Sequence, residues 1–101
     1  MKNILIEDFI KLPESNLQII DVRESYEYQN GHINSINIPM SEILEKHGYI
    51  KPNKTVVIYC QTGRRAAAVV YMLKKTFDLK NIFNLSGGYE AYMKYKNSHQ
   101  N

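Results

Sequence analysis

The chain is poor in cysteine and has no tryptophan: Cys60 is the only cysteine among its 101 residues. A single cysteine cannot form a disulfide within the chain, which agrees with a reducing compartment where a free thiol can stay reactive. The first apolar stretch is interrupted by Glu7 and Asp8, which is too early for a signal peptide. No later apolar run approaches the length of a membrane span. These absences predict a cytoplasmic protein that does not enter a membrane.

Charge and histidine placement exclude several classes of partner. The net charge is +3 and the isoelectric point is near 9.0, but the lysines are spread along the chain and no aromatic-basic motif appears, which argues against nucleic-acid binding. His32, His47 and His99 lie far apart, without a cysteine or carboxylate at ligand spacing, so a metal site is not expected. A glycine-rich nucleotide motif is also missing, and we predict no cofactor.

Length and composition suit one domain with one core. The sequence is 44% hydrophobic and 23% charged, and it contains no repeat or linker-like segment. We therefore expect a single domain over residues 1–101, with its core at about 4–95. We also expect a polar C-terminal tail at 96–101, the only segment where disorder is predicted.

Two continuous apolar runs, Leu17–Val22 and Thr55–Tyr59, are typical of parallel strands covered on both faces. Shorter strands are predicted at 4–6, 35–38 and 81–85. Helices should therefore cover both faces of the sheet.

Three helices are predicted between and after these strands. The first runs from Ser41 to His47 and is ended by Gly48. The second, at 65–77, has apolar residues at helical spacing, and the third follows Gly87 and Gly88, with an aromatic stripe expected to pack on the sheet. The alternation of strands and helices predicts an α/β layered domain with a mainly parallel sheet.

Cys60 is placed where a strand should turn into a helix. In parallel α/β folds the chemistry lies beyond the carboxyl ends of the strands. Free N–H groups of the following helix, with Arg64 and Arg65 in the same turn, would favour thiolate over thiol. The alternative is a small apolar residue at a strand end, where many unpaired cysteines are found. The adjacent Gly63 and the basic pair favour a nucleophile.

Three stretches in order along the chain resemble the rhodanese family of sulfurtransferase domains. The first is Asp21-Val22-Arg23-Glu24, continuing through Glu27-Tyr28 to Gly31-His32-Ile33 and Asn37-Ile38-Pro39; the second is Cys60-Gln61-Thr62-Gly63-Arg64-Arg65; the third is Gly87-Gly88-Tyr89-Glu90-Ala91-Tyr92. The resemblance covers residues 4 to 95. It implies a three-layer domain with a parallel five-stranded sheet flanked by helices, and a catalytic cysteine at Cys60 that carries a persulfide.

The loop after Cys60 suits a persulfide, whose outer sulfur is an anion that needs several donors around it. A short loop can direct the N–H groups of residues 61–66 inward, namely Gln61, Thr62, Gly63, Arg64, Arg65 and Ala66. Gly63 can adopt the positive φ that a tight ring of amides requires. The resemblance implies that Arg65 helps to hold an anionic substrate such as thiosulfate, with Arg64 as a second contact or a solvated charge.

Asp21, Arg23 and His32 are assigned to structure. The resemblance implies that Asp21 and Arg23 fix the fold near the site, and a buried aspartate needs such a partner. His32 could act as a general base, but a histidine with satisfied hydrogen bonds is the more frequent case. We therefore do not assign His32 to catalysis.

The expected reaction moves sulfur from a small anionic donor, or from a persulfide, to a thiol or cyanide without a cofactor. Two alternatives remain: a rhodanese-related phosphatase or arsenate reductase, and a sulfur-relay or interaction module that docks a partner protein. The phosphatase needs five residues between cysteine and arginine, whereas four separate Cys60 from Arg65. Many family members carry a different, often basic, residue in place of Gln61, so the preferred donor is left open.

Overall fold

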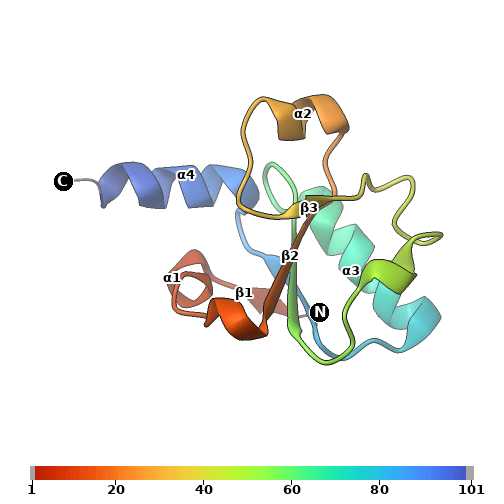
Figure 1. Ribbon diagram of the computed structural model, residues 1–101. Coiled ribbons are helices and arrows are strands. Elements are labelled where there is room, and N and C mark those ends of the chain that lie inside the picture. Colours follow the sequence, from red (N-terminus) through yellow and green to blue (C-terminus); the bar gives the residue numbers. More distant parts are fainter. Residues whose placement is uncertain (1, 100–101) are drawn as a thin grey trace.

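A computed structural model describes residues 2–99 as an α/β domain around one five-stranded sheet in which all strand pairs are parallel (Figure 1). From edge to edge the strands are β1 (Asn3–Ile4), β5 (Ile82–Leu85), β4 (Thr55–Tyr59), β2 (Leu17–Asp21) and β3 (Ile36–Asn37). The predicted α/β class and the five-stranded parallel sheet are confirmed.

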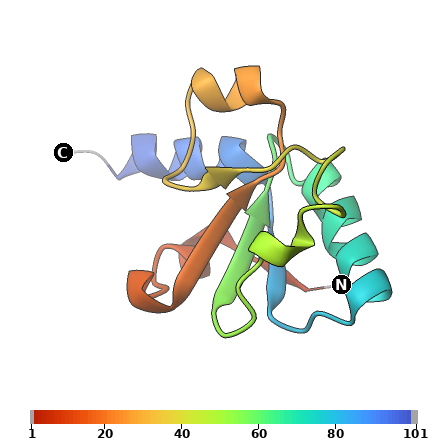
Figure 2. The same ribbon diagram turned by 45° about the vertical axis from the view of Figure 1, so that its right-hand side comes forward.

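Helices cover both faces of the sheet, which produces three layers (Figures 1 and 2). α3 (Arg64–Phe77) packs on one face, while α1 (Ile6–Phe9) and α4 (Gly88–Ser98) pack on the other. α2 (Ser25–Gln29) lies beyond the carboxyl end of β2 (Figure 1). Two short 3₁₀ turns, Glu14–Asn16 and His47–Tyr49, complete the elements.

The central strand β4 is buried on both sides, as its continuous apolar run indicates. Val56 and Ile58 belong to the core beneath α3, whereas Val57 and Tyr59 belong to the core beneath α1 and α4. All four side chains are fully buried. Burial of a valine or isoleucine side chain stabilises the fold by about 1.5–3 kcal/mol, so β4 is a rigid support for whatever follows it.

The prediction of a helix at Ser41–His47 is wrong. Residues 40–46 form turns, and Gly48 lies inside the 3₁₀ turn instead of ending a helix. Within residues 40–50, a single i to i−4 backbone bond occurs, from the Lys46 N–H to the Glu42 carbonyl at 3.0 Å. Ile43 is buried but Leu44 is 38% exposed, so the segment lacks the continuous apolar face whose packing stabilises a short helix.

Smaller differences occur at both ends of the chain. The strand predicted at 4–6 is β1 at 3–4, because Ile6 begins α1. α4 continues to Ser98, so the first residues of the predicted polar tail are helical, while residues 100–101 lie outside the described part.

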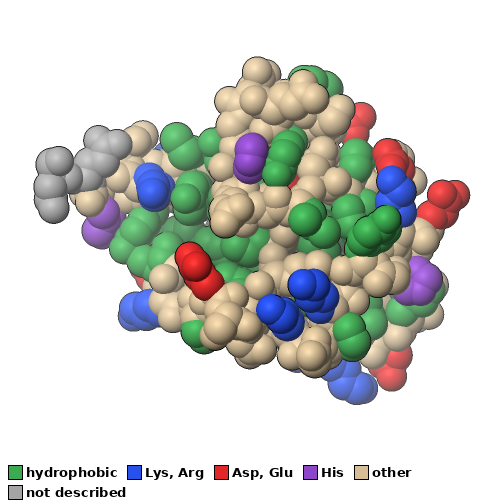
Figure 3. All heavy atoms as spheres, in the orientation of Figure 1, with side chains coloured by type: hydrophobic (Ala, Val, Ile, Leu, Met, Phe, Trp, Pro, Cys, Tyr) green, Lys and Arg blue, Asp and Glu red, His purple; other side chains and the backbone are tan. Residues whose placement is uncertain are grey.

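Hydrophobic side chains gather beneath α4 on the face shown in Figure 3. A hollow of about 460 Å³ opens there, and its lining includes Phe9, Ile33 and Tyr92 but none of residues 60–66. Across residues 2–99, every helix is too short or too polar to cross a membrane.

Candidate active site

Cys60 follows the last residue of β4, and its side chain is only 1% exposed. Residues 60–63 form a short loop that leads directly into α3. This loop lies at the carboxyl end of the sheet, between the first turns of α3 and α4 and below α2 (Figures 1 and 2). The sulfur is therefore held in the rigid part of the molecule, at the edge where the helix N-termini meet.

Two backbone amides donate hydrogen bonds to the sulfur of Cys60. The N–H groups of Gly63 and Ala66 lie 3.1 Å and 3.3 Å from Sγ. Gly63 has φ +102°, a conformation that lets the loop turn back on the sulfur. Because the amides belong to the free N-terminal end of α3, the helix dipole adds to the stabilisation of negative charge at this position.

Four further N–H groups of the loop remain without a protein acceptor. None of the hydrogen bonds formed among residues 2–99 uses the N–H of Gln61, Thr62, Arg64 or Arg65. Successive free amides in a turn form a concave site for an anion. The loop can therefore donate further hydrogen bonds to an anionic atom that is bonded to Sγ or lies next to it.

The N-terminus of α4 fixes the loop from the other side. The N–H groups of Tyr89 and Glu90 donate to the carbonyls of Cys60 and Gln61 at 2.8 Å and 3.0 Å. In a planar trans peptide the N–H points opposite to the C=O. The N–H groups of Gln61 and Thr62 are therefore directed away from α4, and this explains how the third sequence motif shapes the second.

Gly88 permits this contact, and its replacement by alanine should disturb the loop. A Cβ on Gly88 would lie 2.4 Å from the Cys60 carbonyl oxygen, and φ is +60°. The left-handed conformation alone costs about 1–2 kcal/mol for alanine, and the backbone clash adds to it. We expect a lower melting temperature and a lower reactivity of the Cys60 thiol toward an alkylating reagent.

Gly48→Ala is the matched control, because a Cβ there would meet nothing within 4 Å. Thermal unfolding measures the melting temperature of both variants, and mass spectrometry measures how fast Cys60 reacts in each. Equal behaviour of Gly88→Ala and Gly48→Ala would contradict the proposed contact between α4 and the loop.

Asp21, the last residue of β2, and Arg23 form a buried ion pair, with side chains 0% and 3% exposed. Arg23 donates to the Asp21 carboxylate from Nη2 at 2.8 Å and from Nε at 3.1 Å. Burial alone would lower the pKa of Arg23, but the hydrogen bonds and charge of Asp21 more than offset it and raise the pKa above its ordinary value. Arg23 therefore stays charged, as a buried arginine with a satisfied partner should.

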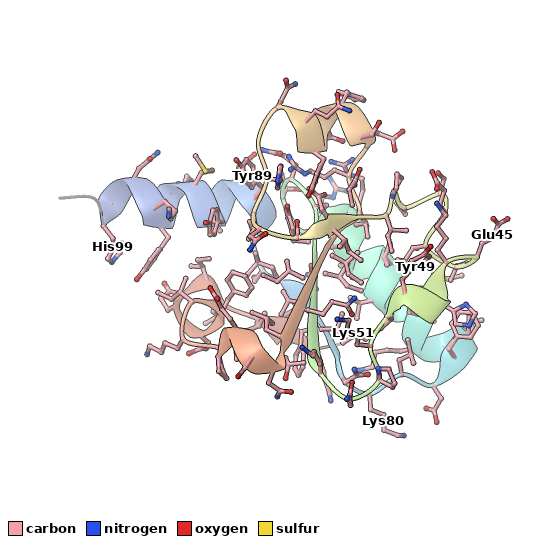
Figure 4. All side chains as sticks on the ribbon, viewed as in Figure 1. Glu45, Tyr49, Lys51, Lys80, Tyr89 and His99 are labelled. Carbon is pink, nitrogen blue, oxygen red and sulfur yellow. The ribbon has the colours of Figure 1, made fainter. Side chains whose placement is uncertain are left out.

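Arg23 also joins the three sequence motifs. Its Nη2 donates to the Gly31 carbonyl at 2.7 Å, and its Nη1 donates to Oε1 of Gln61 at 3.1 Å. Its guanidinium lies 4.6 Å from the ring centre of Tyr89, which Figure 4 labels at the start of α4. The structure thus places the Asp21–Arg23 pair beside the active loop without contact to Sγ.

Glu27 belongs to the first sequence motif, but the sequence analysis gave it no role at the site. It lies on α2, and its two carboxylate oxygens accept hydrogen bonds from Nη1 and Nη2 of Arg65 at 2.8 Å and 2.9 Å. Oε1 also accepts the N–H of Glu24 at 3.0 Å, in a capping box. Two sequence signals could have indicated it: its place in the first motif and its spacing from Glu24 at a helix start.

The bond to Arg65 lowers the pKa of Glu27 from 4.5 to about 2. Because the pKa of the folded state is the lower one, the carboxylate stabilises the fold fully above pH 4.5 and loses this effect as the pH falls toward 2. We expect the melting temperature of the wild type to fall more steeply over this interval than that of Glu27→Gln. Parallel slopes in a pH series of thermal unfolding would contradict the ion pair.

The other predicted site residues lie at the surface. Thr62 and Arg64 are exposed, and no ion pair or side-chain hydrogen bond of Arg64 occurs within residues 2–99. His32 is exposed, its ring stacks on Tyr28 at 3.7 Å, and its Nδ1 lies 2.9 Å from the Tyr28 carbonyl. In the described part of the chain, His, Cys, Asp and Glu side chains form no group of three that could hold a metal ion.

A depression of about 230 Å³ opens beside the loop. It is lined by Arg23, Glu27, Asn30, Gly31, Gln61 and Tyr89. A cysteine sulfur with free amides around it, next to a small open depression, would suit nucleophilic attack on a small molecule or on the end of a larger one.

Comparison with known proteins agrees with this arrangement. The family model described as Rhodanese-like domain matches residues 5–95. The chain is 34% identical over 93 residues to the uncharacterized protein YqhL of Bacillus subtilis, covering 91% of this chain and 72% of YqhL. It is 24% identical over 94 residues to thiosulfate sulfurtransferase GlpE of Shewanella oneidensis, covering 90% of this chain and 91% of GlpE.

A solved structure shows the same fold. The rhodanese-related protein of Thermoplasma volcanium superposes with a TM-score of 0.84 at 32% identity, covering 94% of this chain and 93% of that one. Three other relatives are longer proteins, of which this chain spans 21%, 40% and 28%. With the family model matched over nearly the whole chain, this protein belongs to the family of rhodanese-like domains.

Proposed function

We propose that this chain is a sulfurtransferase that carries a sulfane sulfur as a persulfide on Cys60. The observation that carries the proposal is the set of amides around Sγ. The sulfur accepts hydrogen bonds from two backbone N–H groups, and four more N–H groups of the loop are free. The name of the Shewanella relative, thiosulfate sulfurtransferase, supports the same class of reaction.

The reaction has two displacement steps. In the first, the Cys60 thiolate attacks the outer sulfur of a donor, the new Cys60 S–S bond forms, and the donor's own S–S bond breaks. The leaving group is sulfite when the donor is thiosulfate, and a thiolate when the donor is a persulfide. In the second, a thiol or cyanide takes the outer sulfur and returns the Cys60 thiolate, with cyanide yielding thiocyanate. Neither step requires a cofactor.

The loop would act by holding charge. As the persulfide forms, negative charge moves from Sγ to the outer sulfur, and the free amides of Gln61, Thr62, Arg64 and Arg65 are the donors positioned to meet it. Arg64 would be a solvated surface charge, while Asp21, Arg23 and His32 would have structural roles. A cytoplasmic location, where thiol acceptors are abundant, is part of this proposal.

Two other functions fit the fold less well. A phosphatase or arsenate reductase must hold a tetrahedral oxyanion, and the four residues between Cys60 and Arg65 make a small ring for that purpose. A sulfur-relay module would form the same persulfide but pass it to a partner protein with slow turnover of small donors. That alternative shares the first step proposed here.

A change in loop length tests whether the protein is a sulfurtransferase or a phosphatase. The wild-type protein should transfer sulfur from a sulfane donor to cyanide and should show negligible turnover of an aryl phosphate. Insertion of one glycine between Gly63 and Arg64 should widen the ring, weaken persulfide stabilisation, and permit at least weak oxyanion binding. Steady-state assays of both proteins with both substrates measure this.

Efficient phosphate hydrolysis by the wild type would overturn the sulfurtransferase assignment. Undiminished sulfur transfer by the insertion variant would instead show that loop size does not select the substrate.

A further inference from the structure

The arginine at the end of the active loop is already bound within the protein. Arg65 is the fifth residue after Cys60 and lies in the first turn of α3, whose Ala66 N–H donates to the Cys60 sulfur. Both Nη atoms of Arg65, however, donate to the two carboxylate oxygens of Glu27. This two-point arrangement is the geometry in which arginine also binds oxyanions. A sulfonate-like donor group would have to compete with Glu27.

Glu27 is well placed for that competition. Its side chain is 19% exposed and that of Arg65 is 36% exposed, so the pair is partly shielded from water and is screened less than a surface pair. The bond from the Glu24 N–H to Oε1 fixes the carboxylate before Arg65 binds. Little side-chain entropy is then lost in forming the pair.

The depression beside the loop offers an anion no other free cation. The charged residues in its lining are Arg23 and Glu27. Arg23 is 3% exposed and is held by the Asp21 carboxylate, the Gly31 carbonyl and Gln61. Since the arginine can only donate, the bond from Arg23 fixes the amide oxygen of Gln61 toward the guanidinium. Gln61, directly after Cys60, is neutral and therefore does not attract a dianion as a basic residue at this position would.

We propose that Glu27 is a specificity-determining residue: by holding Arg65 it disfavours thiosulfate and selects a persulfide whose leaving group carries no anionic tail. This inference rests on the proposed sulfurtransferase function and specifies its donor. Thiosulfate must pass the Glu27 carboxylate and displace it from Arg65 to be bound. A persulfide on a neutral thiol needs no such cation, because only its sulfur atoms enter the loop.

Sulfur loading of Cys60 by two donors tests the role of Glu27. One donor is thiosulfate and the other is 2-hydroxyethyl persulfide, which has an uncharged tail. Loading rates are followed by rapid quench and intact mass, which leaves acceptor chemistry out of the measurement, and their concentration dependence gives an apparent dissociation constant for each donor. Glu27→Gln should lower this constant for thiosulfate roughly five- to tenfold and should leave that for the persulfide unchanged.

Two further variants separate competition for Arg65 from a general effect of charge. Glu45→Gln removes the same charge from an exposed turn, where Figure 4 shows Glu45 away from Tyr89, and should change neither constant. Glu27→Gln/Arg65→Gln lacks the released guanidinium and should lose the gain for thiosulfate. Persulfide loading by each variant shows that its loop is intact.

The outcomes distinguish this inference from the proposed function. If the wild type loads sulfur from neither donor, both are overturned. If it loads sulfur but Glu27→Gln changes the two donors alike, or if the double variant keeps the gain, Glu27 does not select the donor and the sulfurtransferase assignment stands.

Discussion

Cys60→Ser is expected to abolish sulfur loading and thiocyanate formation, with a fall in rate of roughly a thousandfold or more. The serine hydroxyl is far less acidic than a thiol at neutral pH and cannot form a persulfide. The variant should remain folded, because a hydroxyl oxygen can accept the N–H bonds that Gly63 and Ala66 now donate to Sγ. Thiocyanate formation from a sulfane donor and cyanide measures the loss.

Thermal unfolding of the same variant is the control. A melting temperature close to that of the wild type assigns the loss to chemistry at the sulfur. Sulfur transfer near the wild-type rate in a folded Cys60→Ser protein would show that the activity lies elsewhere in the chain.

Asp21→Asn is expected to cause the largest loss of stability, because it leaves the buried guanidinium of Arg23 without its counter-charge. Both side chains are almost fully buried, at 0% and 3% exposure, and removing one partner of a buried pair costs about 3–5 kcal/mol. For a domain of this size, such a loss lowers the melting temperature by at least about 10 °C. Calorimetry or thermal circular dichroism measures it.

Asp78→Asn is the matched control for this change. Asp78 also pairs with a cation, Lys80, but at 3.5 Å and with the aspartate 88% exposed, and such surface pairs contribute about 0–1 kcal/mol. We expect no more than a small shift. Similar melting temperatures for Asp21→Asn and Asp78→Asn would contradict the structural role of the buried pair.

The parts of the fold that the sequence predicted are those determined by local patterns. The apolar runs of β2 and β4 indicated buried parallel strands, and the helical spacing of Ala66, Val69 and Leu73 indicated α3. Each of these elements buries a continuous apolar surface, so the pattern and the packing agree. The position of Cys60 at the carboxyl end of a strand followed from the same patterns.

The contacts that shape the loop could not be predicted in this way, since they join distant parts of the chain. Glu27 and Arg65 are 38 positions apart, and the bond from the Tyr89 N–H to the Cys60 carbonyl depends on how α4 packs. The incorrect helix at 41–47 has a related cause: Ile43 is buried but Leu44 is 38% exposed, so packing does not support a helix there, although the local sequence suggested a cap and a helix. Tertiary contacts therefore decided what local preference left open.

Intact-protein mass spectrometry after exposure to polysulfide or thiosulfate tests the central claim, that Cys60 carries a sulfane sulfur, most directly. The account predicts that the wild type gains the mass of one sulfur atom, that cyanide removes it, that peptide mapping places it on Cys60, and that Cys60→Ser gains nothing. Absence of the added sulfur from the wild type with both donors, or an adduct that cyanide does not remove, would contradict it.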